Sequence, residues 1–202
     1  MNLDPLWKYL VVAVGAYLLG CISTGLLISK NSGHDIRQEG SRNIGATNVL
    51  RTVGTAEGLL TFAGDFAKAA VAVLLSKAWL GLDGALVAGL MVVIGHNWPV
   101  TGGFKGGKGV SCTAGAAVCT FFWQGAASCA FFLVVVFLTR YVSLSSLAMC
   151  AMFAVLVSLT EGLWPCGVGA IVLALLACWR HKENIKRLLN GTEHKFTLKK
   201  KQ

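Results

Sequence analysis

Long apolar runs separated by short polar stretches dominate the chain. Five of these runs cover residues 9–28, 59–80, 84–100, 142–160 and 163–179. A helix rises about 1.5 Å per residue, so about 20 apolar residues cross the hydrocarbon core of a bilayer. The pattern therefore predicts five transmembrane helices. Trp7 and Lys8 precede the first run as interfacial anchors, and this run is too long for a cleaved signal peptide.

A sixth apolar run, residues 110–139, is thirty residues long and has Gln124 as its one strongly polar side chain. As a single helix it would measure about 45 Å, well above a bilayer core of about 30 Å. We therefore expect this run to break into two helices, at the Trp-Gln-Gly segment 123–125.

The basic residues support a total of seven transmembrane helices, because Lys and Arg accumulate in cytoplasmic loops. With seven helices, fifteen of the eighteen Lys and Arg residues lie on one side of the membrane. A single helix over 110–139 would place Arg140 and the basic tail on the side opposite the other basic loops. The sequence thus predicts an all-α, polytopic integral membrane protein with its N-terminus outside and its C-terminus in the cytoplasm. The two halves of the sixth run are short, so we expect them to be tilted or to lie in thinned lipid.

The composition agrees with a membrane protein, since 55% of the residues are hydrophobic and 13% are charged, against about 25% charged in soluble domains. The net charge of +9 does not indicate nucleic-acid binding, because the basic residues gather at one membrane interface. They favour contact with anionic lipids or an anionic substrate. The seven cysteines lie within or beside apolar runs without metal-ligand spacing, so we expect packing residues and no metal site. Residues 1–202 are predicted to form one membrane-embedded domain, with a disordered tail at about 195–202.

Polar residues cluster in four places, all on the predicted cytoplasmic side. The first cluster, residues 40–54, has side chains that can hold an anion, and these are Ser41, Arg42, Asn43, Thr47, Asn48 and Arg51. A helix over 46–51 would direct the positive end of its dipole at the same place. The alternative is a solvated basic loop with ordinary capping residues.

The second cluster is GGFKGGKG, residues 102–109, at the end of an apolar run. Gly102, Gly107 and Lys108 nearly satisfy the phosphate-loop pattern, but Gly109 replaces the hydroxyl that binds Mg²⁺ and no strand precedes the loop. A nucleotide-hydrolysing loop is therefore disfavoured. Glycines still allow a backbone to approach a phosphate closely, and a helix starting near Gly109 would offer its N-terminus. The alternative is a re-entrant turn whose lysines extend to the interface.

The third and fourth clusters lie at 139–146 and 180–196. In the third, Arg140 is an isolated charge and Ser143 is a natural helix N-cap. In the fourth, a helix would place His181 and Asn184 on one face, with Arg187 nearby and Gly191 as its C-cap. Ordinary alternatives are a basic anchor for the third cluster and an amphipathic helix lying on anionic lipid for the fourth.

Two further polar groups fall within the apolar runs. Asp65 and Lys68 are spaced i and i+3, which predicts an ion pair inside the helix bundle. A structural role is favoured, and the alternative is that the pair lines the site. His96 and Asn97, just before Pro99, are expected to hold a broken helix end near the glycine loop.

Four segments in order along the chain resemble those of a known family. SRNIGATNVLR, GHNWPV…FKGGKGV, RYVSLSS and RHKENIKRLLNGTE are similar to the signature segments of the bacterial acyl-phosphate:glycerol-3-phosphate acyltransferases, the PlsY family. The resemblance runs from the first apolar run to Glu193. Two departures, the glycine-rich PVTGGF and Ser111 in place of a frequent Ala, leave the cationic residues intact and bear only on loop shape.

The resemblance implies a seven-helix enzyme of the bacterial inner membrane with its active site facing the cytoplasm. It implies transfer of a fatty acyl group from acyl phosphate to the sn-1 hydroxyl of glycerol 3-phosphate, giving lysophosphatidic acid and phosphate, the first step of bacterial phospholipid synthesis. Its partners would be the two substrates, membrane lipids and, functionally, the soluble acyltransferase that makes acyl phosphate. No cofactor, metal or nucleic acid is implied.

The candidate site residues follow from the clusters and the resemblance together. The predicted catalytic residues are His181, Ser41, Lys108 and Asn184. The predicted phosphate-binding residues are Arg42, Asn43, Thr47, Asn48, Arg51, Gly106, Gly107, Gly109, Arg140, Ser143 and Arg187. His181 has an ordinary pKa near neutrality and could deprotonate the attacking hydroxyl, or the donor phosphate could take that proton and leave His181 as a binding residue.

Other functions fit the sequence less well. A phosphate transporter would suit seven helices with a cationic site, but transporters usually show repeats and sites at mid-membrane, and neither is visible. An intramembrane protease lacks support because no Ser-His motif or HExxH spacing occurs. A non-catalytic lipid scaffold would not need Asn184 or the glycine loop.

Overall fold

The computed structural model describes residues 5–196, and every regular element in that range is a helix. The predicted all-α class is therefore confirmed. The chain divides into two compact units, Met1–Phe122 and Trp123–Gln202. Most of the tail that the sequence predicts as disordered, residues 197–202, lies outside the described residues.

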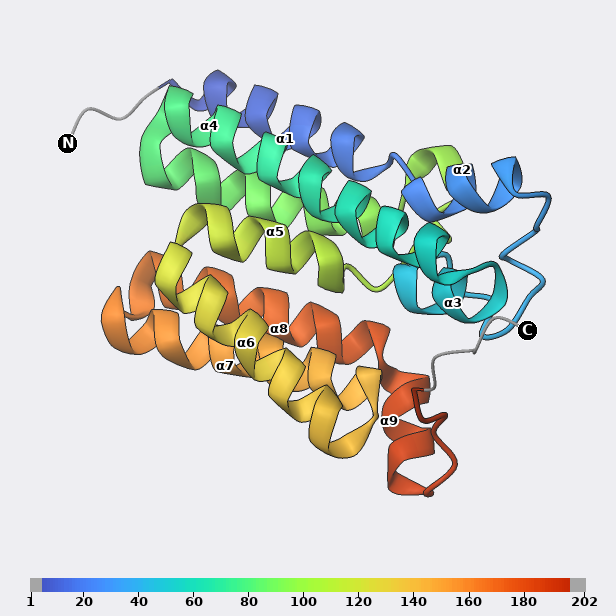
Figure 1. The fold of residues 1–202 in the computed structure, drawn as a ribbon. Helices are drawn as coiled ribbons and strands as arrows, with labels where there is room; N and C mark the ends of the chain where they lie inside the picture. The colour runs from blue at the N-terminus through green and yellow to red at the C-terminus, as the bar shows by residue number, and fades with distance from the viewer. Residues whose placement is uncertain (1–4, 197–202) are drawn as a thin grey trace. The chain divides into compact units, whose positions relative to one another are not determined.

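The first unit is built around one long helix that turns back on itself. Its elements are α1 (Leu6–Gly20), α2 (Thr24–Asn31), α3 (Ala46–Thr52), α4 (Thr55–Asn97), the short 3-10 helix η1 (Val100–Gly102) and α5 (Val110–Thr120). The backbone of α4 leaves helical geometry at Leu80 and Gly81, where Gly81 has a φ of 64°. The two arms of α4 therefore run antiparallel, with α1 and α5 packed along them (Figure 1).

Small residues let these helices approach closely. A side chain at Gly20 or Gly95 would meet backbone atoms across the contact between α1 and the second arm of α4. A side chain at Gly115 of α5 would likewise meet the carbonyl of Phe66 in the first arm. Glycine at such contacts is typical of packed membrane helices, where dispersion contacts supply much of the attraction.

The first apolar run is not one helix, contrary to the prediction for 9–28, because the chain breaks between α1 and α2. The backbone carbonyls that have no partner within a helix at this break accept hydrogen bonds from side chains of the same unit. Cys21 accepts a hydrogen bond from Thr101 Oγ1 at 3.1 Å, and Ile22 accepts one from Lys68 Nζ at 2.6 Å. The break thus satisfies backbone groups that would be costly to leave unpaired in a membrane.

The run 110–139 does break in two, but at Phe121 and not at the predicted segment 123–125. Phe121 has a φ of −131° and a ψ of 88° between α5 and α6 (Phe122–Thr139). Lys77 Nζ donates to the carbonyls of Cys119 and Thr120 at 3.2 and 3.0 Å, which caps the end of α5. Gly125 is instead buried within α6. A lysine from another helix therefore binds the carbonyls at the break, and the local sequence does not reveal this contact.

The second unit contains α6, α7 (Val142–Thr160), the short π-helical segment η2 (Leu163–Gly167), α8 (Val168–Arg180) and α9 (Lys182–Leu189). The helix predicted within 180–196, with Gly191 as its C-cap, is present as α9, but it does not include His181. The backbone of His181, with φ −100° and ψ 10°, separates α8 from α9, and α9 ends before Gly191. Gly191 has a φ of 68° just after the last helical turn, as expected for a helix C-terminus.

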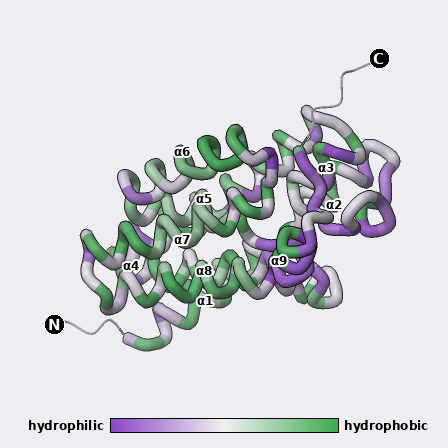
Figure 2. Tube along the Cα trace, turned by 90° about the horizontal axis from the view of Figure 1, so that it is seen from below, coloured by the Kyte–Doolittle hydropathy of each residue, from purple (hydrophilic) through white to green (hydrophobic). Residues whose placement is uncertain are grey.

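Within residues 5–196, five stretches are long and apolar enough to cross a membrane, and these are Leu6–Asn31, Thr55–Gly102, Phe122–Thr139, Val142–Thr160 and Leu163–Arg180. The second of them includes both arms of α4. The shorter α5 is also apolar. In the first unit hydrophilic residues gather around α2 and α3, and in the second they gather on α9 (Figure 2). Each unit therefore has apolar helices and one polar region.

Candidate active site

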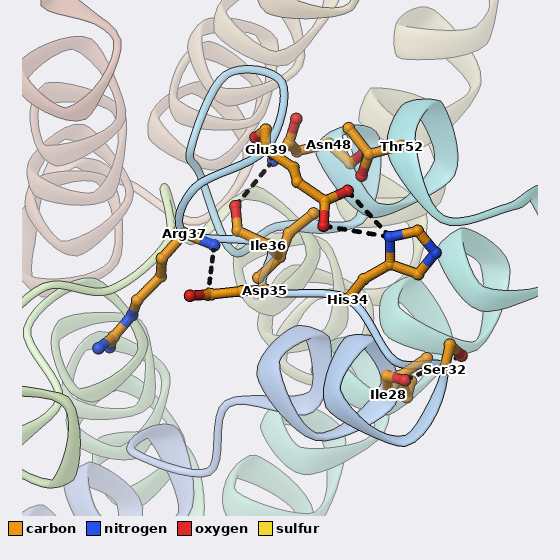
Figure 3. Close-up of polar contacts among 9 residues, drawn as sticks. All are labelled: Ile28, Ser32, His34, Asp35, Ile36, Arg37, Glu39, Asn48 and Thr52. Carbon is orange, nitrogen blue, oxygen red and sulfur yellow. Dashed lines mark hydrogen bonds and ion pairs between the residues drawn. The ribbon is translucent and has the colours of Figure 1, made fainter.

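The polar region of the first unit is organised by the Asn48 side chain. Asn48 Nδ2 lies 3.0 Å from the carbonyl of Glu39 and 2.9 Å from that of Asn43, and Oδ1 accepts a hydrogen bond from the Ser41 N–H at 2.9 Å. Figure 3 shows Asn48 beside the carbonyl of Ile36, 3.4 Å away. Asn48, predicted to bind phosphate, is thus buried and serves the loop backbone.

A small apolar core and a hydrogen-bonded His–Glu pair support the same loop. Ile36, Ile44 and Val49 are buried together beneath it. His34 Nδ1 lies 3.0 Å from the Glu39 carboxylate, and this pair is partly exposed (Figure 3). The loop between α2 and α3 is therefore a folded segment that can present side chains in fixed positions.

Ser41 and Arg42 lie exposed on this loop, where a substrate could reach them. Arg42 has a φ of 59°, in the left-handed region that side-chain-bearing residues rarely adopt. Asn43 Oδ1 accepts from the Gly45 N–H at 2.8 Å just before α3 begins. Strained residues of this kind concentrate at functional sites. Thr47 and Arg51 lie on α3, which confirms the helix predicted over 46–51.

The glycine loop is held against the end of α4. The Gly106 N–H donates to the carbonyl of Asn97 at 3.2 Å, and the Gly107 N–H donates to that of His96 at 3.0 Å. This confirms that His96 and Asn97 hold the helix end near the loop. It also corrects the expected role of the two glycine amides, because they bind backbone carbonyls and are not directed at an anion.

Close packing explains why glycine is needed at these positions. A Cβ at Gly106 would meet the carbonyl oxygen of His96, and a Cβ at Gly107 would meet the His96 ring at Nε2. Gly109, at φ 78°, sits directly before α5, so the helix start expected near this residue is confirmed. Lys108 is half-buried between these glycines.

An arginine joins the glycine loop to the loop that carries Ser41. Arg37 Nη2 donates to the carbonyls of Gly102 and Lys105, both at 3.2 Å. Although these segments are about 65 residues apart in sequence, they form one polar region of the first unit. The predicted residues of this unit are Ser41, Arg42, Asn43, Thr47, Asn48, Arg51, Gly106, Gly107, Lys108 and Gly109.

In the second unit, three predicted residues converge on a carboxylate that the sequence did not single out. Glu193 accepts hydrogen bonds from Ser143 Oγ at 2.9 Å, Asn184 Nδ2 at 2.7 Å and Arg187 Nε at 2.7 Å. The Glu193 side chain is 5% exposed. Ser143 was predicted to be the N-cap of α7. This prediction is wrong, because Tyr141 is the N-cap residue.

Burial raises the pKa of the Glu193 carboxyl, but the hydrogen bonds from Asn184, Arg187 and Ser143 and the charge of Arg187 outweigh that effect. The net pKa lies below its ordinary value, so Glu193 is an anion at neutral pH. Glu193 ends the last of the four recognised segments, and that position was the one sequence signal for it.

His181 lies at the junction of α8 and α9 with its side chain buried. Its Nδ1 is 2.7 Å from the carbonyl of Ala177. A carbonyl only accepts hydrogen bonds, so Nδ1 carries the proton and the neutral ring has its lone pair on Nε2. This tautomer suits a group that accepts a proton through Nε2.

The segment after Glu193 contacts the start of α7. The Phe196 N–H donates to the carbonyl of Arg140 at 2.7 Å, and Lys195 Nζ lies 5.7 Å from the centre of the Tyr141 ring. Residues 195 and 196, predicted to begin a disordered tail, are thus in contact with the helical unit. Arg140 has a φ of 61°, the same unusual conformation as Arg42.

Similarity to known proteins covers nearly the whole chain. The profile of a family described as "Glycerol-3-phosphate acyltransferase" matches residues 10–191. Glycerol-3-phosphate acyltransferases of Alkaliphilus metalliredigens and Clostridioides difficile are each 43% identical, over 93% and 96% of this chain and 95% and 98% of their own. A crystal structure of PlsY (YgiH), an integral membrane glycerol 3-phosphate acyltransferase, in its glycerol 3-phosphate form has a TM-score of 0.88 at 38% identity. That match covers 94% of this chain and 96% of the other.

The apolar helices, the polar regions at helix ends and these similarities define an integral membrane acyltransferase. The chain belongs to the glycerol-3-phosphate acyltransferase family, PlsY, and the resemblance drawn from the four segments is confirmed.

Proposed function

We propose that this protein transfers a fatty acyl group from acyl phosphate to the sn-1 hydroxyl of glycerol 3-phosphate and releases lysophosphatidic acid and phosphate. The observation that carries the proposal is the 38% identity, over 94% of the chain, to PlsY structures in glycerol 3-phosphate and lysophosphatidic acid forms. Those two molecules are the expected acceptor and product. The acyl-phosphate donor and the sn-1 position follow from the resemblance of the four polar segments.

The proposed reaction needs no covalent enzyme intermediate, because acyl phosphate is a mixed anhydride and is already activated. The acceptor hydroxyl oxygen attacks the acyl carbon, the bond from that carbon to the phosphate oxygen breaks, and phosphate leaves with the bonding electrons. Holding two reactants in a productive geometry can lower the barrier by about 7–11 kcal/mol. Positioning is therefore the main task assigned to the protein.

Two anionic substrates repel each other unless cations lie between or around them. The cations that the polar segments of the sequence supply, Arg42, Arg51, Lys108 and Arg140, are proposed for this neutralisation. Ser41, Asn43 and Thr47 add neutral donors on the exposed loop and α3, and the N-terminus of α5 at Gly109 adds a helix dipole.

His181 is the proposed acceptor of the hydroxyl proton. Its Nδ1 proton is donated to the Ala177 carbonyl, so in the neutral ring Nε2 is the nitrogen that can accept a proton. A general base contributes about 10²- to 10⁴-fold in rate. We expect His181→Ala to lose activity in that range, and near-full turnover of this variant would assign the proton to the donor phosphate instead. Asn184 is proposed to act beside His181.

We further propose seven membrane crossings, made by α1, the two arms of α4, α5, α6, α7 and α8, with the N-terminus outside. Residues 1–202 then act as one domain in the bacterial inner membrane, and the polar regions face the cytoplasm. Fifteen of the eighteen Lys and Arg residues would lie on that side. A soluble acyltransferase that makes acyl phosphate would supply the donor.

Phosphate release by the purified protein tests the function. The protein in detergent is supplied with palmitoyl phosphate, with and without glycerol 3-phosphate. We expect phosphate and lysophosphatidic acid to appear together and only when the acceptor is present. Phosphate release that ignores the acceptor, or acyl transfer from a thioester alone, would refute the proposal.

A further inference from the structure

A buried polar cluster in the first unit takes no part in the proposed chemistry. Asp65 and Lys68 lie on the first arm of α4, and His96 lies at the end of the second arm. Their side chains are only 2%, 6% and 5% exposed. Ionised groups this deep in an apolar helix are costly unless paired, and membrane proteins usually retain them for a purpose.

The ammonium group of Lys68 has an acceptor for each of its three N–H bonds. Nζ lies 2.8 Å from Asp65 Oδ1, 2.6 Å from the carbonyl oxygen of Ile22 and 3.0 Å from His96 Nδ1. Thr24 Oγ1 also donates to Asp65 Oδ1 at 2.7 Å. Lys68 therefore links the break after α1 to both arms of α4.

The same cluster contains ligand types that bind transition metals, since atoms of Asp65, His96 and Cys112 lie within 4.8 Å of one another. The Lys68 ammonium, however, already bridges Asp65 and His96 as their cation. A divalent ion in the same place would be repelled by this charge. The Lys68 ammonium group thus occupies the place that a metal ion would take among these side chains.

The contact with Lys68 determines the tautomer of His96. An ammonium only donates hydrogen bonds, so Nδ1 of His96 accepts and the neutral ring carries its proton on Nε2. The alternative, a charged ring donating to Asp65 Oδ1, has the longer distance of 3.4 Å and would set two cations 3.0 Å apart. Lys68 therefore fixes both the orientation and the protonation of the imidazole.

The opposite edge of the His96 ring is the surface on which the glycine loop rests. A Cβ on Gly107 would clash with Nε2, and the His96 carbonyl accepts the Gly107 N–H at 3.0 Å. The next residue along the chain is Lys108. Ring and carbonyl together thus set the position of the backbone that carries this lysine.

We propose that Lys68, held by Asp65, is a positioning residue that acts through His96 to place the glycine loop and Lys108 for phosphate binding. The phosphate-binding role of Lys108 rests on the proposed function, but the position of the glycine loop can be measured independently of that function. Because the links run through side chains buried within one unit, the proposal depends only on contacts inside that unit.

The test uses the full-length protein in detergent and the double variant Asp65→Asn/Lys68→Met, which removes both buried charges at nearly constant volume. Hydrogen–deuterium exchange of residues 102–109 is followed by mass spectrometry. Loss of the Lys68 contact should speed exchange of the Gly106 and Gly107 amides about tenfold or more. The KM for a phosphate-bearing substrate should rise about tenfold, with kcat within about threefold.

Lys77→Met is the matched control, because Lys77 lies on the same helix and donates to two backbone carbonyls at the far end of α5. It should change neither loop exchange nor KM. A purely structural role for the cluster would lower the melting temperature of the double variant while loop exchange and KM stay at wild-type values, and this result would overturn the proposal.

His96→Asn carries the test if the double variant does not purify as folded protein. Its amide oxygen can still accept from Lys68, but the imidazole edge beside Gly107 is gone, so loop exchange should again rise about tenfold. Exchange as slow as wild type would reject the inference. If the wild-type protein makes no lysophosphatidic acid, the proposed function fails, and the exchange measurement still decides the placement of the loop.

Discussion

The polar regions of the two units hold their backbones in different ways. In the first unit the glycine loop is fixed by backbone hydrogen bonds to His96 and Asn97 and by contacts too close for any side chain. In the second unit the segment after α9 is fixed by one carboxylate, Glu193, which gathers three side-chain donors. The first arrangement depends on glycines that have no side chain, and the second depends on the negative charge of the Glu193 carboxylate. The first should therefore be sensitive to added volume, and the second to lost charge and low pH.

Gly107→Ala should have the largest effect, because the added methyl group would meet the His96 ring. Displacing the backbone next to Lys108 by about 1 Å can cost about 100-fold in rate, so we expect at least that loss of acyl transfer. Steady-state kinetics of the purified variant measure it.

Gly103→Ala is the control for this substitution. Gly103 lies in the same loop with a positive φ of 62°, which Gly107 does not have, and no atom lies within 4 Å of the position of its Cβ. Activity close to wild type is expected here. Equal losses in both variants would show that any side chain added to this loop lowers activity, and that the contact of Gly107 with His96 is not the specific cause.

Glu193→Gln should weaken the second unit by removing charge at constant size. A hydrogen bond to a charged group contributes about 1.5–3 kcal/mol, and the Arg187 contact at 2.7 Å is of this kind. We expect a loss of about 2 kcal/mol and a melting temperature several degrees lower. An unchanged melting temperature would contradict the role assigned to Glu193. As a control, the hydrogen–deuterium exchange rate of the glycine loop should be the same as in the wild type.

The pH dependence of stability gives a smaller test of the same charge. The pKa of Glu193 is lower in the folded protein than in the unfolded chain, so its stabilisation is fully present above the ordinary Glu value and is lost as the pH falls through the folded value. The difference in melting temperature between wild type and Glu193→Gln should be constant from pH 7 to about pH 5 and should shrink below about pH 4.5. A difference that persists to pH 3 would exclude titration of this carboxyl.

The smallest effect on stability is expected for His34→Gln. This substitution removes the partner of Glu39, the carboxylate that supports the loop between α2 and α3 in the first unit. This pair is 38% and 34% exposed, and such pairs contribute less than about 1 kcal/mol. Thermal unfolding should shift by a few degrees at most. A loss as large as that of Glu193→Gln would mean that exposure does not account for the difference between the two carboxylates.

Sequence patterns predicted what depends on neighbouring residues. Apolar runs gave the helical class, the polar segment before α3 gave a short helix, and the spacing of Asp65 and Lys68 gave an ion pair, found at 2.8 Å. The resemblance to the family indicated which polar residues to consider, because four similar segments occur in the same order along the chain. These signals are local or repeated, so one sequence is enough to detect them.

What the sequence did not predict depends on contacts between distant residues. Lys77, on another helix, binds the carbonyls just before the break at Phe121, and Ser143 contacts Glu193 fifty residues away. The amides of Gly106 and Gly107 were expected to face an anion, yet they bind the carbonyls of Asn97 and His96. In each case the partner could be found only after the helices were placed.

The reversal of α4 at Leu80 and Gly81 also constrains how the chain can change. Asp65 and His96 meet because a fixed number of residues separates each of them from the turn. One residue inserted into either arm would rotate everything beyond it by about 100° about the helix axis. His96 would then face away from Lys68, although no side chain had been replaced. The lengths of the two arms are therefore as much a part of the glycine loop's support as the residues that touch it.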